Sequence, residues 1–208
     1  MSPRTELQNQ KIKDERREQL LQAASHVFAQ KGFAATRIID IAAEANLSHG
    51  LVYHYFSSKE DIFTALMARA LQGAIRLTSE ALQRSGTPWE RLHSLCEQML
   101  LGLRTTPEVT LLTLQTLLSE GVPEEATAHL REQGTSVFTN LITVIRQGQE
   151  TGEVLASNPV SLALSFFALL QGLTITSVLL KREASMLSPA MLEQFFPGPE
   201  TILRLLKA

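Results

Sequence analysis

The sequence is poor in several kinds of residue, and each shortage excludes a class of protein. Cys96 is the single cysteine, so no intramolecular disulfide can form and a reducing compartment is expected. Charged residues make up only 19% of the chain, with 11 glycines and 8 prolines in 208 residues, which excludes a disordered or collagen-like protein. The polar N-terminal segment has no apolar run, so we expect no secretory signal. We therefore expect a cytoplasmic protein with a sizeable core.

The longest uncharged stretch covers residues 160–180. Its 21 residues are enough to span a membrane. Several of them are polar, and a helix that is apolar on most sides is either a membrane span or covered by protein. The polar positions favour a helix buried in a protein interface and no membrane partner. A helical interaction protein, soluble or membrane-associated, remains the alternative.

Helical spacing of apolar residues and proline-marked helix starts predict an all-α fold of about nine helices. The expected helices are about 13–31, 37–44, 48–55, 58–84, 88–104, 107–120, 123–150, 159–182 and 189–206, the last broken by a Pro-Gly-Pro sequence. Gly32 is expected to end the first helix and Thr36 to cap the second. Short helices give way to longer, more apolar ones, which predicts two domains, 1–57 and 58–208.

Residues 36–56 have the pattern of a helix-turn-helix. A short apolar helix is followed by Ala-Asn-Leu, and Asn46 is one of the few residue types that tolerates the left-handed conformation such a turn needs. Ser48 is a good cap for the second helix, whose Val52 and Phe56 can point inward. In a helix-turn-helix the second helix is placed in the major groove of DNA.

The second helix of this motif carries small and hydrogen-bonding residues where a major groove would be read: Ser48, His49, Gly50, Tyr53, His54 and Tyr55. Gly50 costs about 1 kcal/mol relative to alanine in a helix, and its lack of a side chain would let the backbone approach DNA closely. Consecutive helical positions are 100° apart, so the three rings cannot all be buried. Lys59 lies in the first turn of the helix expected at 58–84, where the helix dipole disfavours a cation. A phosphate bound there would explain why the residue is a lysine.

The stretch QLLQAASHVFAQKGFAATRIIDIAAEANLSHGLVYHYFSSKEDIFTAL resembles the TetR family of bacterial transcriptional regulators, in an AcrR-like form. The resemblance is close from Gln19 to Leu66 and limited to helix number and length elsewhere. It implies an all-α dimer with an N-terminal helix-turn-helix module and a larger helical body. Two positions differ from the common family pattern: Asn46 replaces a frequent glycine, and His49 replaces a frequent lysine.

Carrying the family's roles across implies a set of residues that contact DNA: Thr36, Arg37, Ser48, His49, Gly50, Tyr53, His54, Tyr55 and Lys59. A core tyrosine is the alternative for either Tyr53 or Tyr55, and His26 on the first helix is expected to be structural. The basic residues before residue 18 are interrupted by acidic ones, so we expect a solvated face that adds one or two phosphate contacts. Residues 1–56 carry seven basic and six acidic residues, which predicts modest non-specific affinity for DNA.

The uncharged helix at 159–182 needs a partner on nearly every side. A homodimer through helices 123–150 and 159–182 would supply one, with recognition helices about 34–36 Å apart on a near-palindromic double-stranded DNA operator. The remaining helices could enclose a small, largely apolar effector that releases a repressor from its operator. The candidate lining residues are His93, Cys96, Met99, Gln115, Phe138, Phe167 and Gln171.

The sequence contains little that would support an enzyme. There is no metal-ligand spacing, no glycine-rich phosphate loop and no plausible pair of nucleophile and base. We therefore expect no catalytic residues, no metal and no cofactor. Cys96 has no neighbouring cation in the sequence to activate its thiol, so burial without reactivity is expected.

Overall fold

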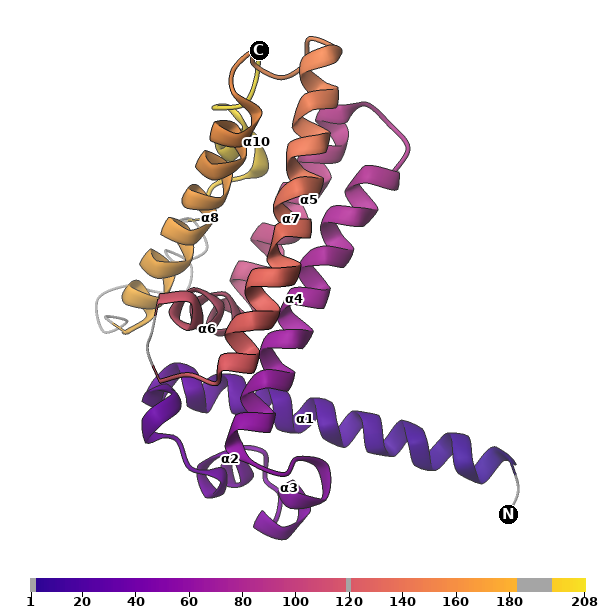
Figure 1. Ribbon diagram of the computed structural model, residues 1–208, viewed down its shortest axis with the longest axis vertical. Coiled ribbons are helices and arrows are strands. Elements are labelled where there is room, and N and C mark those ends of the chain that lie inside the picture. Colours follow the sequence, from indigo (N-terminus) through magenta and orange to yellow (C-terminus); the bar gives the residue numbers. More distant parts are fainter. Residues whose placement is uncertain (1–2, 119–120, 183–195) are drawn as a thin grey trace.

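The computed structural model describes residues 3–118, 121–182 and 196–208, and nearly all of these are helical (Figure 1). The helices are α1 (Pro3–Ala35), α2 (Ile38–Glu44), α3 (His49–Tyr55), α4 (Lys59–Gln83), α5 (Pro88–Thr105), α6 (Pro107–Leu118), α7 (Glu124–Glu150), α8 (Pro159–Arg182) and α10 (Pro199–Leu203). This confirms the predicted all-α fold. From α2 to α8 the predicted ends agree within two residues.

Capping explains why these helix ends could be predicted. Thr87 caps α5, since its hydroxyl accepts from the Glu90 N–H at 3.3 Å while the Glu90 carboxylate accepts from the Thr87 N–H at 2.9 Å. At the start of α4 the cap is Ser58, whose hydroxyl accepts from the Asp61 N–H at 3.0 Å. The Asp61 carboxylate in turn accepts from the N–H of Ser57 at 2.9 Å. Each cap satisfies backbone donors that the helix itself leaves unpaired.

The two ends of the chain differ most from prediction. Helix α1 begins at Pro3, well before the expected residue 13, and its first turns hold no apolar repeat that would indicate a helix. Neighbouring polar side chains support it instead, as where Gln10 donates to Asp14 at 2.9 Å. Gly32 (φ 76°, ψ 163°) breaks the helix where its end was expected. Of the predicted helix 189–206, α10 is observed, and residues 189–195 lie outside the described part.

The N-terminal module consists of α1, α2, α3 and the start of α4. Figure 1 shows α1 lying across the base of the molecule, with α2 and α3 below it and the long helices rising above. Phe28, Phe33 and Phe63 form its aromatic centre, with Phe28 and Phe63 edge to face at 5.1 Å between ring centroids. The same core continues upward to Leu112 of α6 and Leu130 of α7. The module is therefore packed directly against the body.

The body is built around α4 and α7, which pack along much of their length. In Figure 1 these helices stand side by side with α5, while α8 and α10 cover the other side and the short α6 lies beneath. A second core joins α5, α7, α8 and α10, with Phe166, Leu141 and Leu203 almost inaccessible. Because α6 packs against both α1 and α8, it connects the module to the helix at the body's outer edge.

Candidate nucleic-acid interface

The turn between α2 and α3 has the geometry of a helix-turn-helix. Asn46 adopts the predicted left-handed conformation, with φ 53°, and its neighbour Leu47 donates to the Ala42 carbonyl at 2.9 Å. Ser48 caps α3, because its hydroxyl accepts from the Leu51 N–H at 3.3 Å. Val52 is completely buried in the core of the module, which anchors α3 there. The turn and the buried residue together determine which face of α3 meets solvent.

The exposed face of α3 contains most of the residues predicted to contact DNA. Ser48, His49, Gly50 and His54 are exposed, and Tyr53 is 50% exposed. The rings of His49 and Tyr53, one helical turn apart, lie edge to face at 5.0 Å between centroids. They form one surface at the start of the helix, with hydrogen-bonding groups directed away from the core.

Gly50 and Tyr55 differ in their contacts with the rest of the chain, since only Tyr55 packs against the core. A methyl group added to Gly50 would meet nothing within 4 Å, so no neighbour inside the chain requires glycine there. Tyr55 is half-buried and packs partly against the core of the module, while its ring lies 5.3 Å from that of His54. Of the two tyrosines, Tyr53 is therefore the one presented to a partner.

The residues at the start of α2 require a correction. The predicted cap, Thr36, is only 2% exposed and donates its hydroxyl to the Gly32 carbonyl at 2.7 Å. Its hydroxyl therefore satisfies a carbonyl at the break in α1 and does not cap α2. The same hydroxyl is not available to DNA. Arg37 is the residue that precedes α2, and its N–H donates to the Asp40 carboxylate at 3.0 Å. The Arg37 side chain is exposed.

The explanation offered for Lys59 also changes. Its ammonium donates to the carbonyl of Phe33 at 3.0 Å and to that of Ala34 at 3.4 Å. It also lies 4.4 Å from the centroid of the Phe33 ring. These carbonyls follow the break in α1 and lack helical partners, so a cation is favourable there. A phosphate is thus not needed to account for a lysine at this position.

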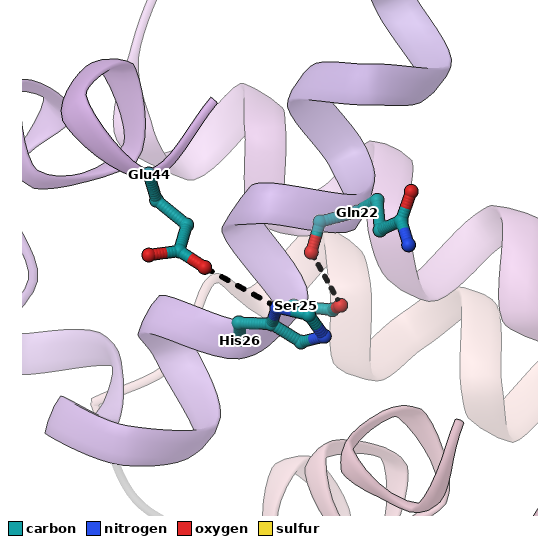
Figure 2. Close-up of polar contacts among 4 residues, drawn as sticks. All are labelled: Gln22, Ser25, His26 and Glu44. Atoms are coloured by element: carbon teal, nitrogen blue, oxygen red, sulfur yellow. Dashed lines mark hydrogen bonds and ion pairs between the residues drawn. The ribbon is translucent and has the colours of Figure 1, made fainter. Parts of the chain in front are cut away.

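Ion pairs between helices hold the exposed face in place, and the sequence did not reveal them. Lys31 of α1 reaches Asp40 of α2 at 2.8 Å. Together with the Arg37 N–H, this ammonium holds the pKa of Asp40 below its usual value. His26 of α1, predicted to be structural, is half-buried, and its Nδ1 lies 3.4 Å from the Glu44 carboxylate on α2 (Figure 2). These contacts fix α2, and through the turn α3, relative to α1.

The body does not bring the predicted effector residues together. Gln115 and Gln171 are exposed, and the Nε2 of His93 lies 3.2 Å from Glu200 of α10. Cys96 is buried in the second core, and this burial raises the pKa of its thiol to about 12. For these four residues the prediction of a pocket lining is not supported, because each is engaged in packing or ion pairing or faces solvent.

Three of the predicted effector residues do lie between helices of the body. The rings of Phe138 on α7 and Phe167 on α8 stack with centroids 5.8 Å apart. Both are half-buried, and Met99 of α5 packs against the same core. Among the described residues no cluster of His, Cys, Asp and Glu could hold a metal ion.

Helix α8 presents the largest apolar stripe of the body. Residues 159–180 are long and apolar enough to cross a membrane, yet only a third of this stretch is buried inside the chain. One face packs inward through Ala163, Phe166 and Leu170. The opposite face exposes Leu164 (56%) and Leu179 (55%), with further exposed residues at helical spacing between them. An isolated chain therefore leaves this face in water.

Comparison with known proteins agrees with the geometry of the module. Residues 20–66 match the family model described as "Bacterial regulatory proteins, tetR family". An uncharacterized HTH-type transcriptional regulator, YfiR of Bacillus subtilis, is 28% identical over 80% of each chain. The HTH-type transcriptional repressor KstR2 of Mycobacterium tuberculosis is 35% identical over 38% of this chain and 40% of its own.

The fold of the whole chain also has counterparts. A TetR-family transcriptional regulator from Agrobacterium tumefaciens superposes with a TM-score of 0.72 at 20% identity, covering 94% of this chain and 100% of that one. At this identity the likeness concerns the fold alone. The sequence relatives named above are HTH-type transcriptional regulators, the class of protein that the sequence predicts.

Proposed function

We propose that the chain is a member of the TetR family of bacterial transcriptional regulators. From this premise we propose that it is a cytoplasmic, ligand-responsive repressor that binds a near-palindromic operator as a homodimer. The observation that carries the proposal is the exposed face of α3, where His49, Gly50 and Tyr53 are presented by a helix anchored through buried Val52. Family members bind operators and small-molecule effectors as dimers.

In the proposed complex α3 enters the major groove with its N-terminal residues at the base edges. Ser48 and His49 are short or planar hydrogen-bonding groups that can reach these edges, and exposed Gly50 lets the backbone come close. Tyr53 and His54 point away from the core and would contact phosphates or sugars, as would the side chain of Arg37. Tyr55 and Lys59 would contribute at most through the parts of their side chains that remain accessible.

The proposed dimer joins α8, with part of α7, to the same helices of a second copy. The exposed face of α8 repeats every three or four residues: Val160, Leu164, Ala168, Gln171, Ile175 and Leu179. Two such stripes related by a two-fold axis would cover each other in a four-helix interface. Small residues at Ala168 and Gly172 permit close approach of the two helices. Division into a DNA-binding part at 1–57 and an effector and dimer part at 58–208 follows from this arrangement.

The effector is proposed to act between α7 and α8, where Phe138 and Phe167 stack. A largely apolar ligand that separates these rings would shift α8 and, through α6, the position of α1. Since α1 fixes α2 by the Lys31–Asp40 and His26–Glu44 contacts, the spacing of the two α3 helices would change. Effector and operator would then weaken each other's binding reciprocally, by about 1–3 kcal/mol.

The test is selection of bound duplexes from a random DNA pool by the purified protein. We expect a palindromic site whose half-sites lie about one helical turn apart. His49→Ala and Tyr53→Ala should each weaken binding to that site by about 1–3 kcal/mol without lowering the unfolding temperature. Leu155→Ala, at an exposed position in the α7–α8 connection and far from α3, is the control (Figure 1). Failure to select any site would reject the proposal.

The alternative is a helical interaction protein without DNA binding, and the apolar stripe of α8 is the observation that favours it. Gel filtration without detergent separates the two functions, since a repressor should elute as a dimer. A protein that requires detergent, or that remains a monomer, would support the alternative. Release of the operator on addition of an apolar compound that binds the dimer would identify the effector class.

A further inference from the structure

We propose that the N-terminal arm, residues 6–18 of α1, binds duplex DNA that flanks the operator half-site, through Lys13, Arg16 and Arg17. The inference rests on the proposed function, because it extends the DNA contact of α3 along the same duplex. Only residues 13–18 of the arm were predicted to be helical, and the Asp and Glu residues interspersed within the arm conceal its charge pattern.

The arm has little contact with the rest of the chain. Residues 8–18 are all exposed, including the apolar Ile12 at 50%. Figure 1 shows this part of α1 extending well beyond the module. A helix of this length is marginal in water without tertiary contacts, and here side-chain pairs such as Lys11–Glu15 support it. Such an exposed helix has much of its surface available to a partner.

Helical spacing places the cations of the arm on one particular face. Lys13, Arg16 and Arg17 are followed at the same spacing by Leu20, Leu21 and Ala24, which pack in the core with α2, α3 and α4. The basic stripe therefore continues the face of α1 that is directed to the helix-turn-helix. The guanidinium of Arg17 lies 5.0 Å from the centroid of the Phe56 ring, at the C-terminal end of α3.

Glu15 and Glu18 lie on the opposite face of the arm. Glu18 pairs with Arg69 of α4, and Glu15 lies 3.9 Å from Lys11. This face lines a cleft against α4 and the α5–α6 connection. Arg16 donates to the neutral side chain of Gln19 at 2.7 Å, and Lys13 has no polar partner within the described residues. The cations beside α3 are thus not neutralised by carboxylates, which makes an anionic partner favourable on that side only.

The length of the arm suits DNA flanking the operator. From Glu6 to Arg17 the helix rises by about 16 Å, since each residue adds 1.5 Å. That distance corresponds to about five base-pair steps of duplex, which carry closely spaced phosphates on both strands. Because the stripe begins beside the end of α3, an α3 helix seated in the major groove would place the arm along the adjoining backbone. The geometry favours phosphate contacts, which are independent of sequence.

The experiment compares two duplexes that contain the selected operator, one ending at its last base pair and one longer by about eight base pairs on each side. Binding of the full-length dimer is measured by fluorescence anisotropy at several KCl concentrations. We expect wild-type protein to bind the longer duplex roughly tenfold more tightly, with a steeper salt dependence. Lys13→Gln/Arg16→Gln should remove this difference and reduce the salt slope by about 1 for each phosphate that is no longer neutralised.

Matched variants show whether the tighter binding to the longer duplex depends on the position of a cation in the arm or only on the total charge. Lys13→Gln and Lys11→Gln each remove one exposed cation from the same turn, on opposite faces of the arm. Glutamine preserves the helix, which circular dichroism can verify. Only Lys13→Gln should weaken binding to the longer duplex. Equal binding of both duplexes by the wild type, or equal effects of the two lysine variants, would overturn the arm proposal alone. Absence of any specific site would reject the proposed function as well.

Discussion

Two exposed surfaces of this protein, on α3 and on α8, differ in chemistry. The surface of α3 is short and carries hydroxyl, imidazole and phenol groups that water can solvate. The surface of α8 is long and exposes leucine and isoleucine side chains. A polar surface can remain in water until a polar partner arrives, whereas a long apolar stripe is costly to leave uncovered. The comparison indicates a reversible partner at α3 and a permanent one at α8.

The most severe test of this comparison is Leu164→Arg. A charged side chain within the apolar stripe would have to be buried without a partner in the dimer, so we expect monomers on gel filtration. Operator affinity should fall by at least roughly a hundredfold, because each α3 would then bind its half-site independently. Leu101→Arg on α5 is the matched control, since Leu101 is 53% exposed and Leu164 56%. If both variants remained dimeric, α8 would not be the interface.

A second test separates the stability of α3 from its function. Gly50→Ala meets no neighbour within the chain, and alanine should stabilise the short helix by up to about 1 kcal/mol. The added methyl group faces the proposed groove, so operator affinity should fall roughly fivefold or more. Thermal unfolding and anisotropy titration measure the two effects. An alanine variant that is more stable and binds equally well would show that the backbone of α3 does not approach DNA closely.

The smallest effect concerns the support of α3 by Asp40. Its pKa is lowered in the folded protein by the ammonium of Lys31 and by the Arg37 N–H. A lowered pKa means that the ionised carboxylate adds stability above its unfolded pKa of about 3.8, and that this contribution disappears as the pH falls through the lower, folded value.

Asp40→Asn should therefore lower the unfolding temperature at pH 7, and the difference from wild type should vanish at strongly acidic pH. Unfolding is followed by circular dichroism across this range. Asp14→Asn, at a carboxylate bonded to the neutral amide of Gln10, serves as the control. A difference between wild type and Asp40→Asn that does not depend on pH would indicate that packing, and not charge, is impaired.

Local signals determined which parts of the molecule could be predicted. Three of these signals act over only a few residues: the helix caps, the left-handed Asn46 and the apolar spacing of α2 to α8. The neighbouring residues were therefore enough to predict these helices and the turn. The exposure of His49 and Tyr53 followed from the same spacing once Val52 was recognised as buried. The helix-turn-helix and its outward face were therefore predictable.

The two errors concern contacts that depend on how α1 ends. Thr36 was expected to cap α2, but the break at Gly32 leaves a carbonyl that its hydroxyl satisfies. Lys59 was expected to need a phosphate, but the chain folds so that two carbonyls 25 and 26 residues away meet its ammonium. Neither contact can be identified from a capping or spacing pattern, because both depend on how α1 ends and that of Lys59 depends also on where α4 begins.

Periodicity and capping thus specified the helices of this protein, their ends and the polar face of α3, since these depend on interactions within one or two turns. Tertiary packing decided which predicted effector residues lie between helices and which cations are already paired. The physical reason is that burial and ion pairing depend on surfaces brought together from separate segments. A pattern read along one segment contains no information about the surface that will cover it.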